Sequence, residues 1–335
     1  MKRSAKYLAV ALAAAMGATL GMGPAQAATT PKPTVIMVGA DIGDPFYQAM
    51  HCGMIAGAKK YNVNLVWTGT EGVDWQPELT AFNAAVTLKP KAIITAPFSP
   101  TAFINPIQKA QAKGIPVVTV DGSNNKLVEL QNIRTGNDKA GFAAGDAMGK
   151  ALGGKGKVAV ISFAADVPAQ VERVNGFKAG LAKYPGIQLV AEDYGGADSA
   201  KSAQKTAALL QRYPDLNGIF GTDTNDAAGV ASAVKAAGKQ GQIKVFGYDT
   251  GAPAIADLKA GVYDGLVGQS PYNIGLTAVQ TVAQYLSGTN KNPPKQVFTT
   301  GGLVTRENLN TAAGKQFTYT GCKELGTGPY SAYTP

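Results

Sequence analysis

Five aspartates stand in the sequence at the end of an apolar run or in the turn after one. They are Asp41, Asp44, Asp121, Asp223 and Asp249. Such runs are typical of buried parallel strands, and open parallel sheets bind ligands beyond the carboxyl ends of their strands. Arg173 is the only arginine among the candidate site residues, so the set argues against a sulfate, phosphate or carboxylate ligand. It leaves a neutral polyol or a cation.

Aromatic residues directly follow the acids of the first turn. Asp44 precedes Pro45, Phe46 and Tyr47, which is typical of a helix that has Asp44 as its N-cap. Phe46 lies on the apolar face of that helix and could be a core residue, whereas Tyr47 points off that face and is the better ligand candidate. A polyol has C–H faces and alternating donors and acceptors, so it suits a site that combines aromatic rings with polar groups.

Simpler explanations exist for several of these residues. Asp44 could act only as an N-cap, and Arg173 could merely cap backbone carbonyl groups. Asp249 and Gln269 follow predicted strands and could be turn formers. These side chains form one site only if the two halves of the chain face each other.

Metal binding and catalysis find little support in the sequence. Two pairs of acids have a spacing that could hold calcium, namely Asp41 with Asp44 and Asp223 with Asp226, but neither lies in a twelve-residue calcium loop. The single histidine, His51, is next to Cys52, and adjacent helix positions point about 100° apart. The chain has no G-x-S-x-G elbow and no phosphate-binding glycine loop. We therefore expect no metal, no cofactor and no enzyme activity.

The elements that must position these residues alternate between strand and helix. Val35–Val38 is a predicted strand, and the helix from Pro45 follows it. Residues 53–61 of this helix are identical to residues 176–184 at five of nine positions, and each of the two segments leads into another predicted strand. The pattern predicts an α/β protein with two similar doubly wound parallel-sheet lobes.

The order of these elements predicts how the chain is divided between the lobes. We expect residues 28–135 plus 271–298 to form the N-terminal lobe, and residues 136–270 plus 299–335 to form the C-terminal lobe and tail. The chain would then pass between the lobes three times, which makes a three-crossing hinge. The tail beyond Gly301 has few periodic signals.

Residues 1–27 have the features of a cleaved signal peptide. Lys2, Arg3 and Lys6 precede an alanine-rich apolar stretch, and Ala25-Gln26-Ala27 fits a cleavage site. Its removal takes three positive charges from the formal net charge of +9, and the remaining lysines form no basic run, so we expect no nucleic-acid partner. No cysteine follows the apolar stretch as a lipid-attachment site. The sequence thus predicts a periplasmic or secreted protein without a lipid anchor.

The chain has two cysteines, Cys52 and Cys322. An even number of cysteines in an oxidising compartment favours one disulfide, which would pin the tail onto the N-terminal lobe. Two separate thiols are the alternative.

Several short motifs together resemble a known family. They are Asp-Pro-Phe-Tyr at 44–47, Val-Asp-Gly at 120–122, Arg-Val-Asn-Gly-Phe at 173–177, Gly-Tyr-Asp at 247–249 and Gly-Gln at 268–269. With these motifs in this order, roughly Thr34 to Thr299 resembles the type I periplasmic sugar-binding proteins, and most of all their ribose-binding branch. The resemblance implies a monomer that captures a sugar between two closing lobes and delivers it to the membrane permease of an ABC transporter.

The resemblance also implies roles for individual residues. Phe46 and Tyr47 would stack on the sugar, and polar contacts would come from Asp44, Asp121, Arg173, Asp223, Asp249 and Gln269. Asp41 is a further candidate from its place at the strand end. Gly122 stands where ribose-binding members have arginine, and Asp44 and Asp223 stand where asparagine is usual, so the resemblance does not fix ribose as the ligand.

Other functions fit the sequence less well. A sugar-responsive gene regulator can share this core, but the signal peptide and the absence of a helix-turn-helix before Thr34 argue against one. The same fold could instead bind a furanose-like signalling molecule or a small cationic solute held by the acids. A cation would favour a cage of several aromatic rings, and only Phe46 and Tyr47 are well placed in the sequence.

Overall fold

The computed structural model describes residues 31–322. The predicted signal peptide at residues 1–27 lies outside the described residues, and so does the end of the tail from residue 323. Between residues 31 and 322, no helix is both long enough and apolar enough to cross a bilayer.

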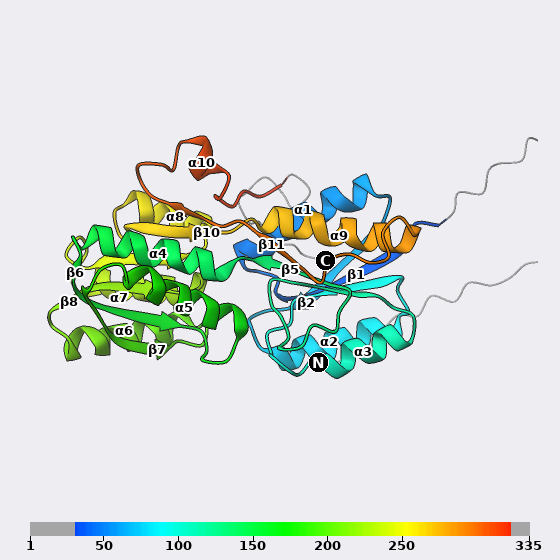
Figure 1. The fold of residues 1–335 in the computed structure, drawn as a ribbon, viewed down its shortest axis with the longest axis horizontal. Helices are drawn as coiled ribbons and strands as arrows, with labels where there is room; N and C mark the ends of the chain where they lie inside the picture. Colours follow the sequence, from blue (N-terminus) through cyan, green and yellow to red (C-terminus); the bar gives the residue numbers. More distant parts are fainter. Residues whose placement is uncertain (1–30, 323–335) are drawn as a thin grey trace, which may run out of the picture. The chain divides into compact units, whose positions relative to one another are not determined.

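The first sheet has six strands, and all of its neighbouring pairs are parallel. In spatial order they are β11 (Gln296–Thr299), β5 (Gln131–Thr135), β4 (Val117–Val120), β3 (Ala92–Thr95), β1 (Thr34–Asp41) and β2 (Asn64–Thr70). Figure 1 shows helices on both faces of this sheet, α1 (Pro45–Lys60) with α9 (Pro271–Ser287) on one, and α2 (Trp75–Thr87) with α3 (Ile104–Ala112) on the other. We call this sheet and its four helices the first lobe.

The second sheet repeats this plan. In spatial order its strands are β12 (Gly302–Val304), β10 (Gly265–Gly268), β9 (Lys244–Tyr248), β8 (Leu216–Gly221), β6 (Lys155–Ser162) and β7 (Gly186–Tyr194). Only the pair of β12 with β10 is antiparallel. Its helices are α4 (Asn137–Ala151), α5 (Pro168–Leu181), α6 (Ser199–Arg212), α7 (Thr224–Ala236) and α8 (Ala252–Lys259). We call this assembly the second lobe.

Successive residues of the central strands point to opposite faces, so each sheet has a core on both sides. In β1, Met37 packs in the cluster that contains α1 and α9, whereas Ile36 packs in the cluster that contains α2 and α3. In β6, Val160 packs against α4 and α5, and Ile161 packs with residues of α6, α7 and α8. Burial on both faces explains why these strands read as continuous apolar runs.

The structure confirms the predicted fold class of two parallel-sheet α/β lobes. The chain passes between the lobes after β5, after β10 and between β11 and β12. Apolar runs in the sequence do not reveal β5, which is largely polar, or β12, which has only three residues. The exact boundaries of the lobes stay a prediction.

The tail is also more ordered than its sequence indicates. After β12 it forms a short helix, α10 (Ala312–Lys315), and continues to Cys322. Cys322 is bonded to Cys52 of α1, with 5.8 Å between their Cα atoms. The expected disulfide is therefore confirmed, and the alternative of two separate thiols is wrong.

Candidate functional site

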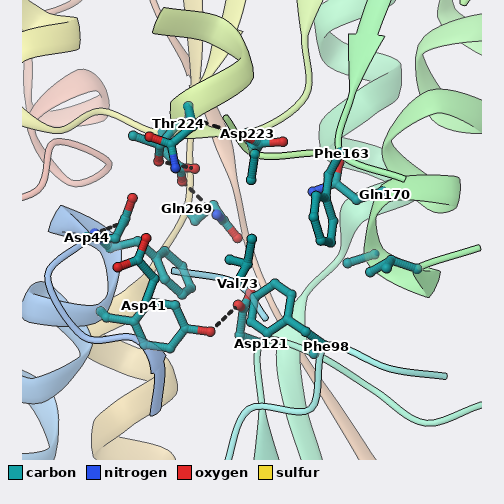
Figure 2. A pocket seen from close by; sticks show the side chains of 18 of the residues that line it. Asp41, Asp44, Val73, Phe98, Asp121, Phe163, Gln170, Asp223, Thr224 and Gln269 are labelled. Carbon is teal, nitrogen blue, oxygen red and sulfur yellow. Dashed lines mark hydrogen bonds between the residues drawn. The ribbon is translucent and has the colours of Figure 1, made fainter. Parts of the chain in front are cut away.

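A cavity lies between the carboxyl ends of the strands of the two sheets (Figure 2). All the residues that the sequence analysis named as ligand candidates line it: Asp41, Asp44, Phe46, Tyr47, Asp121, Arg173, Asp223, Asp249 and Gln269. They come from positions more than two hundred residues apart and meet because parallel strands end at the same edge of a sheet. The part that each plays in binding stays a prediction.

The first lobe places Asp44 at the start of α1. Its Oδ1 accepts a hydrogen bond of 2.7 Å from the backbone N–H of Phe46, so its predicted role as N-cap is confirmed. Burial, and next the negative charge of Asp249, raise the pKa of Asp44 from 3.8 to about 8. Near neutral pH this carboxyl group therefore holds a proton and can donate a hydrogen bond.

Phe46 and Tyr47 both serve the core and the cavity. They are 4% and 3% exposed, and both pack in the cluster under α1. The sequence placed Phe46 on the apolar face of the helix and favoured Tyr47 as the ligand residue. In the structure both side chains pack in the core and both line the cavity. The Tyr47 hydroxyl donates to Oδ2 of Asp121 at 2.8 Å, which orients this carboxylate at the end of β4.

Arg173 reaches the cavity from α5. Its Nε donates to Oδ1 of Asn137 at 2.9 Å, and its Nη1 donates to the carbonyl of Thr222 at 2.8 Å. The guanidinium carbon lies 3.8 Å from the ring centroid of Tyr248. Arg173 thus does cap a carbonyl group, and these contacts also fix its plane against the cavity. Burial raises the pKa of Asp121, and the charge of Arg173 opposes that rise.

Asp249 and Gln269 form a bonded pair at the ends of β9 and β10. Gln269 Nε2 donates to Oδ1 of Asp249 at 2.7 Å, and the hydroxyl of Thr224 donates to its Oδ2 at 3.0 Å. Gln269 Oε1 accepts from the hydroxyl of Thr135, at the end of β5, at 2.6 Å. Asp249 also has a φ of +70°, a left-handed conformation that is uncommon outside glycine. These two residues are therefore more than turn formers, since their side chains build one network.

Asp223 is the N-cap of α7. Its Oδ1 accepts from the backbone N–H groups of Asn225 and Asp226 at 3.0 and 2.9 Å. Its Oδ2 is buried and has no hydrogen-bond partner among the described residues. Burial, and then the charge of Asp226, hold the pKa of Asp223 well above its usual value. The carboxyl group of Asp223 therefore interacts with that of Asp226 behind the cavity wall.

Two phenylalanines of the cavity were missed. Phe98 follows β3 in the first lobe and Phe163 directly follows β6 in the second, and their ring centroids lie 6.2 Å apart in an edge-to-face arrangement. Figure 2 shows the two rings at the side of the cavity away from Asp44. Their positions after strands were the signal, the same one that pointed to the aspartates. Gln170, which accepts from the Thr222 hydroxyl at 2.6 Å, is a further lining residue that had no such signal.

The cavity offers no evident place for a metal ion. Across residues 31–322, no three histidine, cysteine or acidic side chains are grouped so that they could hold one. The acids lie on opposite walls, and Asp44, Asp121, Asp223 and Asp249 each accept at least one hydrogen bond from a neighbouring group. What the arrangement can do is surround a small polar molecule with aromatic rings, carboxyl groups, one guanidinium and one amide.

A comparison with known families identifies this architecture. The model of the periplasmic binding protein domain matches residues 35–290. The chain belongs to this periplasmic binding protein family.

Similar proteins carry names that refer to sugars. The D-ribose/D-allose-binding protein of Pseudomonas aeruginosa is 26% identical over 299 residues, which cover 86% of this chain and 93% of that protein. The D-allose-binding periplasmic protein of Escherichia coli K12 is 29% identical, over 84% and 90% of the two chains. An ABC transporter solute-binding protein of Agrobacterium vitis, solved with α-D-tagatopyranose, has a TM-score of 0.83 at 29% identity, over 86% of this chain and 100% of that one.

Proposed function

We propose that this periplasmic binding protein captures a neutral sugar or polyol between its lobes and presents it to the permease of an ABC transporter. The observation that carries the proposal is the composition of the cavity, where aromatic rings from both lobes flank a network of oriented polar side chains. Rings suit the C–H faces of a sugar, and paired carboxyl, amide and guanidinium groups suit its hydroxyls. The names of the similar proteins support the same ligand class.

The proposed mechanism is closure of the lobes on the ligand. A sugar that contacts both walls favours the closed form by its greater affinity for that form. Arg134 of β5 forms a bidentate ion pair with Glu172 of α5, with 2.8 Å from Nη2 to Oε1, and so joins the two lobes beside the cavity. We propose a monomer that binds and releases its ligand unchanged, exported by its signal peptide.

A second candidate ligand is a cationic sugar such as an amino sugar. The specific observation is that five acids and one arginine line the cavity. A positively charged ligand would ionise Asp44, whereas a neutral sugar would accept a hydrogen bond from its protonated form. The two ligand classes are therefore distinguishable by proton release on binding.

A thermal-shift screen of the mature, ligand-stripped protein tests the proposal. The panel contains D-ribose, D-allose, D-tagatose, D-fucose, xylitol and D-glucosamine. A ligand at a thousandfold excess over Kd stabilises the native state by about 4 kcal/mol, which is a shift of several degrees. We expect a neutral member to shift Tm. A shift with D-glucosamine alone would favour the second candidate, and no shift with any member would overturn the proposed function.

A further inference from the structure

The tail after β12 passes from the second lobe to the first. Phe317 packs in the second-lobe cluster with α7 and α8, and Tyr319 packs in the first-lobe cluster beneath α1. Three residues further on, Cys322 is bonded to Cys52 of α1. The tail therefore links the lobes covalently, in addition to the three connections between the sheets.

Tyr319 lies directly behind the polar network of the cavity. Its hydroxyl donates to Oδ1 of Asp249 at 2.6 Å and accepts from the backbone N–H of Gln269 at 3.1 Å. The side chain is 5% exposed and does not line the cavity. Because Gln269 Nε2 donates to the same Oδ1, that oxygen is fully engaged, and the rotation of the Asp249 carboxylate is fixed.

The tail is held in this place by contacts on both lobes. Thr250, next to Asp249, donates its hydroxyl to the carbonyl of Phe317, and its own carbonyl accepts from the N–H of Tyr319 at 3.4 Å. On the other side, the Tyr319 ring meets the edge of Phe46, with 6.1 Å between ring centroids. The disulfide then fastens the segment to the helix that carries Asp44, Phe46 and Tyr47.

We propose that Tyr319 is a positioning residue for ligand binding, which holds Asp249 and Gln269 in place from behind the cavity, and that the Cys52–Cys322 disulfide keeps it there. The inference rests on the proposed function, since it concerns the affinity of the same site. A carboxylate that is already oriented loses no rotational freedom when it meets a sugar hydroxyl, so preorganisation raises affinity. Without the tail, Asp249 keeps its bonds from Thr224 and Gln269 but loses one of the two donors to its Oδ1, so the ligand must supply part of its ordering.

The first test is the variant Tyr319→Phe, which removes one hydroxyl and keeps the ring. Kd is measured by calorimetry for the panel sugar that binds the wild type most tightly, and we expect it to rise about tenfold or more, because hydrogen bonds to charged groups are among the strong ones. The matched control is Tyr213→Phe, whose hydroxyl bonds the carbonyl of Val190 at 3.2 Å away from the cavity. It should leave Kd unchanged. An unchanged Kd in Tyr319→Phe would overturn the proposal.

The second test removes the disulfide with Cys52→Ser/Cys322→Ser. We expect a several-fold rise in Kd, because the tail is still held by Phe317 and Thr250. In this background Tyr319→Phe should cost less affinity than it does in the disulfide-bonded protein, since both changes loosen the same contact. A disulfide that only stabilises the fold would lower Tm and leave Kd and this coupling unaffected, which would overturn its part in the proposal.

A third measurement needs no sugar and so separates this inference from the proposed function. Hydrogen exchange at the Gln269 amide reports whether its bond to Tyr319 is intact. We expect exchange there to accelerate about tenfold in Tyr319→Phe, to accelerate less in the double serine variant, and to stay at the wild-type rate in Tyr213→Phe. If no panel sugar binds, the proposed function fails, and unaccelerated exchange in Tyr319→Phe would independently overturn the role of Tyr319.

Discussion

The two walls of the cavity are built differently. On the second-lobe wall, Arg173 and Asp249 each have several hydrogen-bond partners, so their orientation is set before a ligand arrives. The first-lobe wall carries the rings of Phe46, Tyr47 and Phe98, and its acids have fewer side-chain hydrogen bonds: Asp44 caps its own helix and Tyr47 orients Asp121. We infer that the polar side chains of the second lobe select the pattern of hydroxyls, while the first-lobe rings, together with Phe163 of the second lobe, cover the apolar faces.

The contrast also bears on closure. A preorganised polar wall can bind part of a ligand in the open form, because little ordering cost remains. The aromatic rings of the first-lobe wall add to the binding free energy only when the lobes close and exclude water. Phe98 and Phe163, one from each lobe, meet edge to face beside the ligand space and therefore depend on the closed arrangement.

The largest expected effect comes from removing a member of the polar wall. Arg173→Ala and Asp249→Ala should each raise Kd for the best panel sugar at least about a hundredfold, because truncation leaves buried charged partners unpaired. Calorimetry measures Kd, and circular dichroism checks the fold. The matched controls are Arg212→Ala on α6 and Asp257→Ala on α8, which alter exposed or half-exposed charges outside the cavity. Unchanged affinity in both cavity variants would contradict the comparison of the walls.

An intermediate effect is expected from the aromatic residues. Phe98→Ala and Phe163→Ala should each raise Kd about tenfold, since each loses a ring surface and an edge-to-face contact worth about 0.5–1.5 kcal/mol beyond area burial. Phe142→Ala, at a ring that is 40% exposed on α4, is the control. If the phenylalanine variants matched the hundredfold loss of the polar variants, the distinction between the polar and the aromatic residues of the cavity would be wrong.

Sequence reasoning found the polar part of the site because strand ends and helix caps have local signatures. Asp44 before Pro45 is such a signature, and so is an apolar run that ends at Asp121 or Asp249. The same rule applied to aromatic residues would have found Phe98 and Phe163.

What the sequence did not show depends on contacts between distant segments. β5 is largely polar, and its polar side chains are paired with distant residues. Arg134 donates to Glu172, and Gln131 accepts from Thr281. Tyr319 reaches Asp249 across 70 positions, in a tail with no periodic pattern. Such residues are placed by tertiary packing, so neither periodicity nor propensity identifies them.

The smallest expected effect concerns the protonation of the first-lobe wall. The pKa of Asp44 is 3.8 ordinarily and about 8 in the folded protein. Between these values the unfolded chain has released this proton and the folded protein has not, so the free energy of unfolding falls as the pH rises from about 4 to 8. Asp44→Asn keeps a capping side chain but has no such proton. Its Tm should therefore exceed that of the wild type by an amount that grows to a few degrees near pH 8.

Asp223→Asn extends this test to the second wall. The pKa of Asp223 is also raised, with burial as the main cause, so its variant should gain Tm over the wild type in the same direction as the pH rises. The control is Asp198→Asn, since Asp198 caps α6 in the same way at an exposed position. Scanning fluorimetry from pH 4 to pH 9 measures all three differences. A Tm difference that stays constant with pH in Asp44→Asn would show that this carboxyl group is ionised in the ligand-free protein. The first-lobe wall would then carry a full negative charge, and the cationic ligand would become the better candidate.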